Sequence, residues 1–152
     1  MLLFLHKVQH RLYTYKVPLI PQLIKGFIFL IFGCVLPPQV AIGSNTRLWH
    51  HGLGVIFHPG SSIGQNCNIY NHVVLGGGHD GPDGLPVRII VEDNVNIGAG
   101  AKILCRKPPL ILREGTTVAA NAVVMSDTIK GEVVAGVPAV RVKIKKQYEN
   151  EQ

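Results

Sequence analysis

Two adjacent histidines, His50 and His51, are the residues of this chain best suited to chemistry. They stand in a short run, HHGLG at 50–54, that interrupts a regular spacing of apolar residues on either side. The histidine side chain has a pKa near neutrality, so its neutral form is available at that pH. The neutral imidazole can take the proton of a hydroxyl or an amine, and histidine therefore often acts as a general base. The sequence therefore favours proton abstraction by one of this pair.

The cysteines offer no competing chemistry. The chain has three, Cys34, Cys67 and Cys105, and their spacing matches no zinc-binding pattern. Cys67 falls where the apolar repeat uses small residues, so we interpret it as a packing residue. An odd number of cysteines without a secretory signal indicates a reducing compartment, and we expect a cytoplasmic protein.

The elements that position the histidines follow from a period of six residues. Such a period is neither the 3.6 of a helix nor the alternation of a plain strand. It is typical of a coil of short strands joined by tight turns, with one aliphatic side chain per side pointing inward. We therefore predict an all-β solenoid over 39–140. The inward aliphatic positions are Phe57, Ile63, Ile69, Leu75, Val91, Ile97, Ile103, Leu112, Val118 and Val124, and the small inward positions are Cys67, Val73, Ala101 and Ala122.

One long insertion breaks this period. After the fourth aliphatic the spacing lengthens to sixteen residues, and the added sequence is rich in glycine, proline and aspartate. A coil cannot take such a segment inside, so we expect a loop over 77–89 that projects from a corner, where insertions in solenoids usually meet ligands. Gly76 and Gly77 open it, and glycine lets a ligand approach the backbone closely. His79 in this loop is a candidate contact to a substrate.

Residues 1–38 are expected to form a helical segment ahead of the coil. Apolar residues at helical spacing predict an amphipathic helix over 1–16, and a second helix is predicted over 22–33. The side of the first helix that we expect to be apolar carries Leu5, Val8 and Leu12.

The second helix has three roles open to it. Its apolar run is interrupted by Lys25, and the remainder is too short to span a bilayer. The helix could cover the end of the coil, pack against another subunit, or attach peripherally to a membrane with the help of nearby lysines.

The charge of the chain leaves its partner open. The net charge is +6, and no nucleic-acid motif accompanies it, so it fits solubility, a phosphate-bearing ligand or an anionic membrane. Arg141 and Lys143 lie in a basic tail that we expect over 141–152, fraying from Gln147. These two side chains are candidates for contact with phosphates.

Several segments resemble the hexapeptide-repeat acyltransferases. They are IGAGAKIL at 97–104, AANAVV at 119–124 and AGVPAV at 135–140. LWHHGLGVIFHPGSSIGQNC at 48–67 is similar to the segment with the catalytic histidine in the serine acetyltransferase branch. The resemblance implies a left-handed parallel β-helix and a homotrimer with active sites between neighbouring subunits. It also implies acetyl-CoA as co-substrate, in a groove between two subunits, and no metal.

The resemblance also implies roles for individual residues. The catalytic base is His50 when the register is counted from Ile42 and His51 when it is counted back from Ile63; we prefer His50, because sequences of the HGGLGIVIHP type place their histidine there. The base would activate an acceptor that attacks the thioester directly. The residues implied to line the acetyl-CoA groove are Gly76, Gly77, Gly98, Ala99, Gly100, Ala119, Ala120 and Gly136, with Arg141 and Lys143 near the phosphates.

Two departures from the serine acetyltransferase pattern leave the acceptor open between L-serine and a sugar of a polysaccharide precursor. Trp49 stands where those enzymes carry an aspartate, and Gly84-Leu85 stand where they carry an Arg-His pair. Arg88 could replace the missing positive charge, and Trp49 offers a flat surface for a sugar ring. Trp49, His79 and Arg88 are therefore the expected acceptor-binding residues.

Two other readings remain open. A hexapeptide coil could serve as a non-catalytic scaffold for assembly. Another branch of the family is a trimeric, metal-dependent carbonic anhydrase, which needs three histidines meeting across a subunit interface. The histidines available for such a site are His50, His51, His72 and His79.

Overall fold

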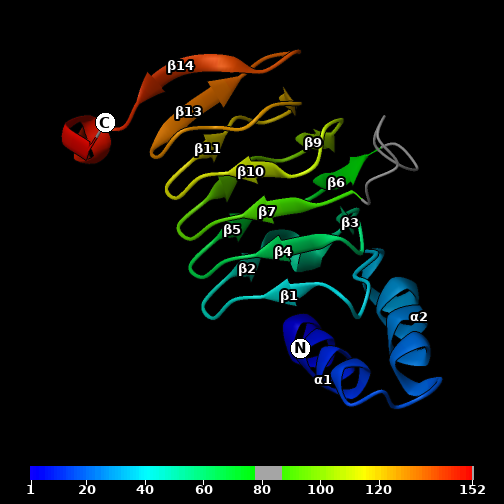
Figure 1. Ribbon diagram of the computed structural model, residues 1–152. Helices are drawn as coiled ribbons and strands as arrows, with labels where there is room; N and C mark the ends of the chain where they lie inside the picture. The colour runs from blue at the N-terminus through cyan, green and yellow to red at the C-terminus, as the bar shows by residue number, and fades with distance from the viewer. Residues whose placement is uncertain (78–86, 152) are drawn as a thin grey trace.

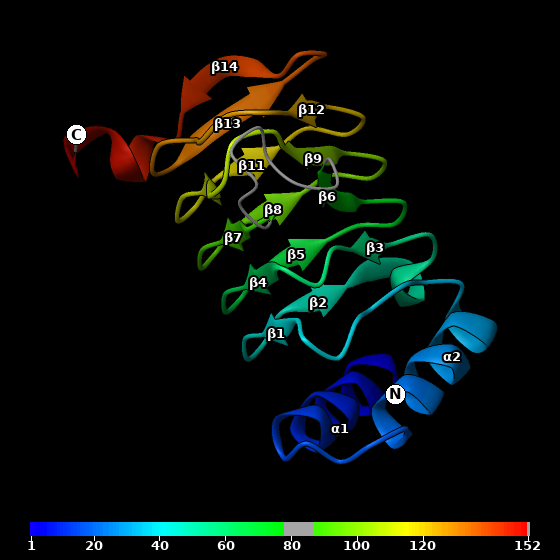
Figure 2. The ribbon, with the colours of Figure 1, turned by 45° about the vertical axis from the view of Figure 1, so that its right-hand side comes forward.

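The computed structural model is a three-sided coil of short, mostly parallel strands, with two helices lying across its first end (Figures 1 and 2). It describes residues 1–77 and 87–151. The chain passes repeatedly through three sheets in the same order, so each sheet collects one strand from successive turns of the coil. The predicted solenoid is thus confirmed as a parallel three-sheet β-helix.

Each sheet stacks strands that are far apart in sequence. The first sheet contains β1 (Ala41–Ile42), β4 (Ser61–Ile63), β7 (Ile89–Val91) and β10 (Leu110–Leu112). The second contains β2 (Arg47–Leu48), β5 (Asn68–Ile69), β8 (Asn96–Ile97), β11 (Thr117–Val118), β13 (Glu132–Ala135) and β14 (Val140–Ile144). The third contains β3 (Ile56–Phe57), β6 (Val74–Gly77), β9 (Lys102–Cys105) and β12 (Val123–Val124).

Two of the three corners matter for the site. We call the turns from the second sheet to the third the histidine corner; it comprises residues 49–55, 70–73, 98–101 and 119–122. We call the connections from the third sheet to the first the loop corner; its described residues are 58–60, 87–88 and 106–109.

The six-residue register is confirmed throughout the core. Every predicted inward aliphatic, from Phe57 to Val124, is at most 5% exposed, and the four small inward residues are fully buried. Phe57 pairs with Leu75 and Leu75 with Ile103, so the aliphatics stack in columns along each sheet. Because each column removes apolar surface from water at every coil, this stacking is the main source of stability.

The two helices cover the first end of the coil, at slightly different bounds from those predicted. α1 spans Leu2–Thr14 and α2 spans Ile20–Phe32. Pro21 lies in the first turn of α2, and Gly33 ends the helix in the left-handed conformation. Ile28 on α2 is fully buried in the core of the coil. Of the three roles left open for the second helix, covering the coil is the one visible in a single chain.

The most buried residues of α1 include a polar pair that was not predicted from the sequence. The buried residues of this helix are Leu2, His6 and Gln9, whereas Leu5, Val8 and Leu12 are only partly buried. His6 and Gln9 point inward because their side chains hydrogen-bond to backbone carbonyls of the segment that leads into the coil. His6 Nε2 bonds the carbonyl of Val40 (2.9 Å), and Gln9 Nε2 donates to the carbonyl of Leu36 (2.8 Å) and to His6 Nδ1 (2.8 Å).

The C-terminal segment is ordered, contrary to the expectation of fraying from Gln147. β14 turns back and pairs antiparallel with β13, which closes the far end of the coil. After it, a short 3-10 helix, η2 (Lys146–Glu151), places Tyr148 in a buried position. A Cβ at Gly115 or Gly131 would overlap the Tyr148 ring, so the two glycines create the space that it fills.

The expected loop over 77–89 is shorter at both ends. Gly77 belongs to β6 and Ile89 to β7, and Val87 is buried. His79 lies outside the described residues. Among the described residues, no helix combines the length and apolar character needed to cross a membrane.

The His6 contact predicts how stability varies with pH. Burial lowers the pKa of His6 from 6.5, with the nearby His10 adding to this, while the hydrogen bond to Val40 opposes it. Because the unfolded chain takes up the proton more readily, stability is full above a pH of about 6.5 and falls as the pH drops below it. The melting temperature should therefore drop more between about pH 7.5 and about pH 5.5 in wild type than in His6→Gln. Equal drops in the two proteins would contradict this role of His6.

Candidate active site

The histidine pair lies in an enlarged turn of the coil. Leu48 pairs with Ile69, and Phe57 pairs with Leu75. The step from Leu48 to Phe57 is nine residues, whereas the step from Ile69 to Leu75 in the next coil is only six. The surplus forms a short 3-10 turn, η1 (Trp49–Gly52), at the histidine corner. Both histidine side chains are exposed there. The turn carrying the pair therefore bulges out of the first coil, while the next coil keeps the six-residue spacing.

The backbone of this turn is strained at both histidines. His50 has φ 52° and His51 has φ 56°, the left-handed region that residues other than glycine seldom adopt, although Asn, Asp and His do so more often than the rest. Each such residue costs roughly 1–2 kcal/mol. The turn is held by hydrogen bonds from Leu53 N to His50 O (3.2 Å) and from Gly54 N to Gly33 O (2.9 Å). Strain of this kind, maintained by surrounding structure, is common at functional sites.

The N-terminal helices border the histidine pair, which sequence reasoning missed. Met1, Leu2 and Leu3 line a hollow with Trp49 and both histidines, and Ile31 and Phe32 of α2 line an adjoining one. Leu2 packs closely on Gly52: a Cβ added to Gly52 would lie 2.9 Å from Leu2 Cδ2. Nothing in the six-residue period reveals these contacts, because the helices lie outside it.

Trp49 forms an aromatic pair beside His50. Its ring stacks on Tyr70 of the next coil, with centroids 5.7 Å apart and planes inclined by 10°. Its Nε1 donates to Asn68 Oδ1 (3.0 Å), and the Arg47 guanidinium lies 5.9 Å from the ring centroid. Both rings are more than a third exposed. The turn therefore presents a fixed aromatic surface next to the histidines.

Small residues continue the histidine corner in the coils that follow the pair. Gly98, Ala99 and Gly100 form the turn of the coil after residues 70–73, and Ala119 and Ala120 form the turn of the coil after that. Hydrogen bonds from Gly100 N to Asn71 O and from Asn121 N to Ala99 O, both 2.9 Å, tie the turns together. The structure thus brings these predicted groove residues onto the same edge as the histidines.

Close coil contact explains one glycine of this edge. A Cβ on Gly98 would lie 2.6 Å from the backbone nitrogen of Ala120, so a side chain at Gly98 would push the coils apart. Gly136 follows β13 at the far end of the edge, and its carbonyl accepts from Val123 N (3.0 Å).

The other predicted residues lie at a different corner. Gly76 and Gly77 end β6, and Arg88 precedes β7, so all three adjoin the loop corner. Gly77 is needed for packing, because a Cβ would lie 2.6 Å from the carbonyl oxygen of Cys105, whereas Gly76 has room around it. One chain does not bring these residues and the histidine pair together.

Comparison with known proteins assigns the family. A family model described as the hexapeptide repeat of succinyl-transferase matches residues 88–126. A serine acetyltransferase of Synechococcus elongatus is 32% identical over 133 residues, which are 88% of this chain and 52% of the relative. The chain belongs to the hexapeptide-repeat acyltransferase family. It spans about half the length of that serine acetyltransferase.

Solved structures support this membership. Neisseria gonorrhoeae serine acetyltransferase in complex with serine superimposes with a TM-score of 0.83 at 28% identity, covering 93% of this chain and 55% of that one. The Brucella abortus enzyme in complex with coenzyme A gives 0.84 at 26% identity, covering 94% and 55%. This hexapeptide-repeat chain therefore shares its fold with proteins solved with each of these ligands.

The predicted phosphate contacts lie on β14. Arg141 Nε pairs with Glu132 Oε1 (2.7 Å), and the Glu132 side chain is only 8% exposed. Glu132 also accepts from the backbone nitrogen of Ile129 (2.7 Å), which fixes the carboxylate. Lys143 is exposed on the same strand. The ion pair fixes the direction of Arg141, which the sequence did not reveal.

The remaining histidines have local partners. His58 Nδ1 accepts from Gly60 N (3.0 Å), as suits a turn residue. The His72 ring packs against Gly54, so it supports the histidine turn from the next coil. Its Nδ1 lies 2.8 Å from Asn71 Nδ2. Within the described part of the chain, no group of three His, Cys, Asp or Glu residues could hold a metal ion.

Gly98 and Gly76 have contrasting surroundings and so provide a matched test of the contact between coils. Gly98→Ala should lower the free energy of unfolding by about 2 kcal/mol, because the added Cβ meets backbone atoms of the next coil. Gly76→Ala should change it by less than about 0.5 kcal/mol, because its nearest neighbour would be 3.6 Å away. Urea denaturation measures both. Equal effects of the two substitutions would show that the coil spacing does not depend on Gly98.

Proposed function

We propose that this protein is an acetyl-CoA-dependent O-acetyltransferase. The observation that carries the proposal is the strained, exposed His50-His51 turn on the same edge as the small-residue turns 98–100 and 119–120. A scaffold would not need two histidines in the left-handed conformation at a solvent-exposed bulge. The likeness to serine acetyltransferases supports the same reaction class.

His50 is the proposed general base, with His51 as the alternative. The neutral imidazole takes the proton of the acceptor hydroxyl as the oxygen forms a bond to the thioester carbonyl carbon. The C–S bond then breaks, the coenzyme A thiolate leaves, and the imidazolium returns the proton to the sulfur. No covalent acetyl-enzyme is needed. This agrees with burial of the thiols: Cys34 is buried and its pKa is raised by that burial to about 11.

Acetyl-CoA is proposed to lie along the histidine corner. Gly98, Ala99 and Gly100 leave room for the pantetheine arm, as do Ala119 and Ala120 on the next turn. Gly136 continues the edge, and Arg141 and Lys143 on β14 are the proposed phosphate contacts. The coenzyme A complex of the similar Brucella abortus enzyme supports a coenzyme A derivative as the ligand.

A homotrimer is proposed because one chain leaves its candidate residues at two corners. Packing three coils side by side would let the loop corner of one chain meet the histidine corner of the next. Gly76, Gly77 and Arg88 would then complete a site that faces a neighbour's His50.

The three cysteines are free and buried, which supports a reducing compartment, and we propose a cytoplasmic protein.

Two acceptors are proposed. L-serine is the first, because a similar structure was solved in complex with serine. A sugar hydroxyl is the second, and the Trp49–Tyr70 pair favours it, since stacked aromatic rings bind the apolar faces of sugars. Trp49 and Arg88 are the described residues proposed to contact the acceptor.

Paired substitutions of the histidines test the base. Asparagine tolerates the left-handed conformation, so His50→Asn and His51→Asn should keep the turn while removing the imidazole. We expect His50→Asn to lower kcat by about 10²- to 10⁴-fold. His51→Asn should retain most activity. Release of free thiol from acetyl-CoA measures both, and an unchanged kcat in both variants would exclude this pair as the base.

The aromatic pair distinguishes the acceptors. With a sugar acceptor, Trp49→Ala should raise KM about three- to tenfold through loss of the stacking surface. With L-serine the same substitution should change KM little. Thiol release with L-serine and with a series of monosaccharides measures this, and Tyr15→Ala, an exposed tyrosine in the link between the helices, is the control. A sugar that is acetylated with unaltered KM in Trp49→Ala would rule out the stacking role.

A further inference from the structure

The outer side of α2 is an apolar surface that the chain leaves uncovered. Pro21 and Ile28 are buried on the inner side of this helix. On the outer side, Ile20, Leu23, Phe27, Leu30 and Ile31 recur at helical spacing. These five, with Leu19 before the helix and Phe29, are between 47% and 79% exposed. A contiguous patch of such side chains marks an interaction surface.

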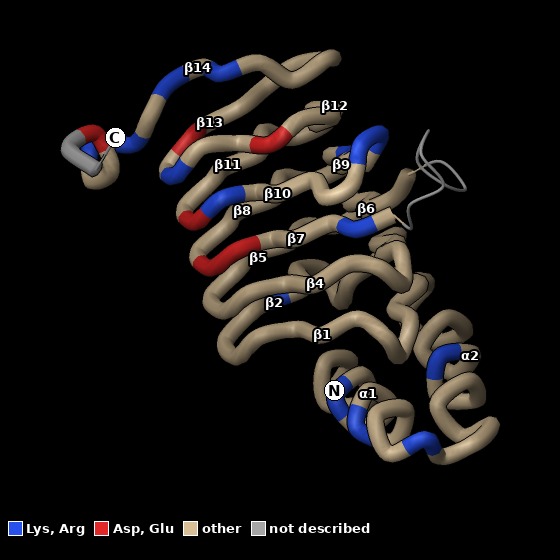
Figure 3. Tube along the Cα trace, viewed as in Figure 1, with Lys and Arg blue, Asp and Glu red and all other residues tan. Residues whose placement is uncertain are grey.

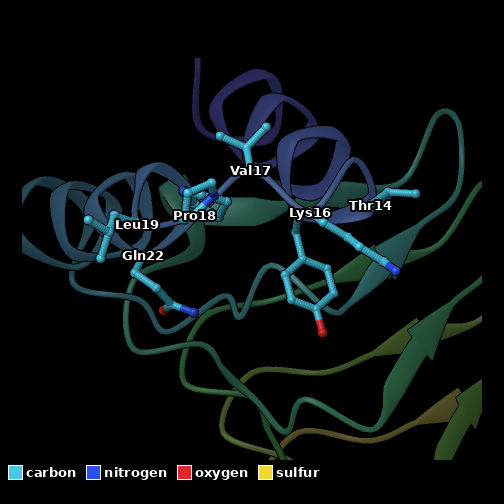
Figure 4. A pocket seen from close by; sticks show the side chains of 8 residues that line it. Thr14, Lys16, Val17, Pro18, Leu19 and Gln22 are labelled. Carbon is cyan, nitrogen blue, oxygen red and sulfur yellow. The ribbon is translucent and has the colours of Figure 1, made fainter.

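The charges around this patch are of one sign. None of the nine acidic residues of the chain precedes residue 80, whereas Lys7, Arg11, Lys16 and Lys25 belong to the helical segment. Figure 3 shows the same separation among the described residues, with basic residues on the helices and the first acidic ones at the end of β7. In the link between the helices, Lys16, Val17 and Leu19 line one open hollow (Figure 4). Lys25 on α2 and Lys16 in the link thus adjoin the apolar surface.

This combination identifies the partner. We propose that α2 and the adjoining link bind the surface of an anionic lipid bilayer, with the apolar side of α2 lying in the interface and the lysines meeting the headgroups. A helix with one apolar side and flanking lysines lies in the membrane plane rather than across it. A second copy of this chain is a poorer partner, because two such layers would bring only positive charges together.

The location of the surface gives the binding a consequence. Ile31 on the apolar side also lines the hollow that contains His50 and His51. A bilayer held by α2 would therefore lie next to the histidine turn. In the proposed trimer, three helical layers would lie at one end of the assembly and would bind together, which strengthens attachment. The membrane proposal does not itself depend on acetyl transfer.

Vesicle co-sedimentation of the full chain tests the proposal. We expect the protein to sediment with vesicles of phosphatidylcholine and phosphatidylglycerol, to stay largely in solution with phosphatidylcholine alone, and to be released by high salt. Leu23→Gln with Phe27→Gln and Leu30→Gln should weaken partition into the anionic vesicles at least about tenfold. Lys16→Gln with Lys25→Gln should reduce binding and its salt dependence.

Matched controls come from the other end of the molecule. Val137, Val140 and Val142 are 62% to 72% exposed, so their replacement by Gln also removes three exposed apolar side chains but leaves α2 unchanged. Arg106→Gln with Lys107→Gln is the control for charge. Failure of wild type to sediment with anionic vesicles, or equal binding by the α2 and control variants, would overturn the proposal. A smaller oligomer of the α2 variant in light scattering, without vesicle binding by wild type, would instead assign the surface to contact between copies.

Discussion

The parallel hydrogen-bond ladder between coils is the constraint on which the rest of the structure depends. It sets neighbouring strands about 4.8 Å apart, so each turn must fit within that height and return the chain in register. Six residues per side satisfy this, with aliphatics stacking inward. Between Leu48 and Phe57 the chain has nine, and the surplus must leave the ladder at a corner. The ladder to the next coil therefore forces the histidine pair outward, while the N-terminal helices border the pair on the other side.

The fold was largely predictable because one side-chain property, inward apolar character, recurs at fixed spacing. Phe57 and Ile97 could be placed in the core from sequence because a slip of one residue would expose a whole column. The burial of His6 and Gln9 could not be predicted from sequence. These side chains are buried because they hydrogen-bond to backbone carbonyls that come close only in the folded chain. The order at Tyr148 was missed for a similar reason, because the glycines that make room for it lie far away in sequence.

The site was predictable only in part. The break in the repeat located His50 and His51, and the register placed Gly98 and Ala120 on the same edge. The stacking of Trp49 on Tyr70 depends on which residues face each other across coils, and the border with Leu2 and Ile31 depends on how the helices dock. Gly76 and Arg88 lie at another corner, which explains why one chain cannot form the whole proposed site. The proposed assembly, acceptor and membrane contact all rest on surfaces that the coil itself leaves open.

The most direct test is a structure of the protein bound to coenzyme A. The account predicts a trimer in which the pantetheine arm runs beside Gly98–Gly100 and the thiol lies within hydrogen-bond reach, directly or through one water, of His50 or His51. The loop corner of a neighbouring chain should complete the same site. Coenzyme A bound away from the histidine corner, or within a single chain that makes no contact with a neighbour, would contradict the account.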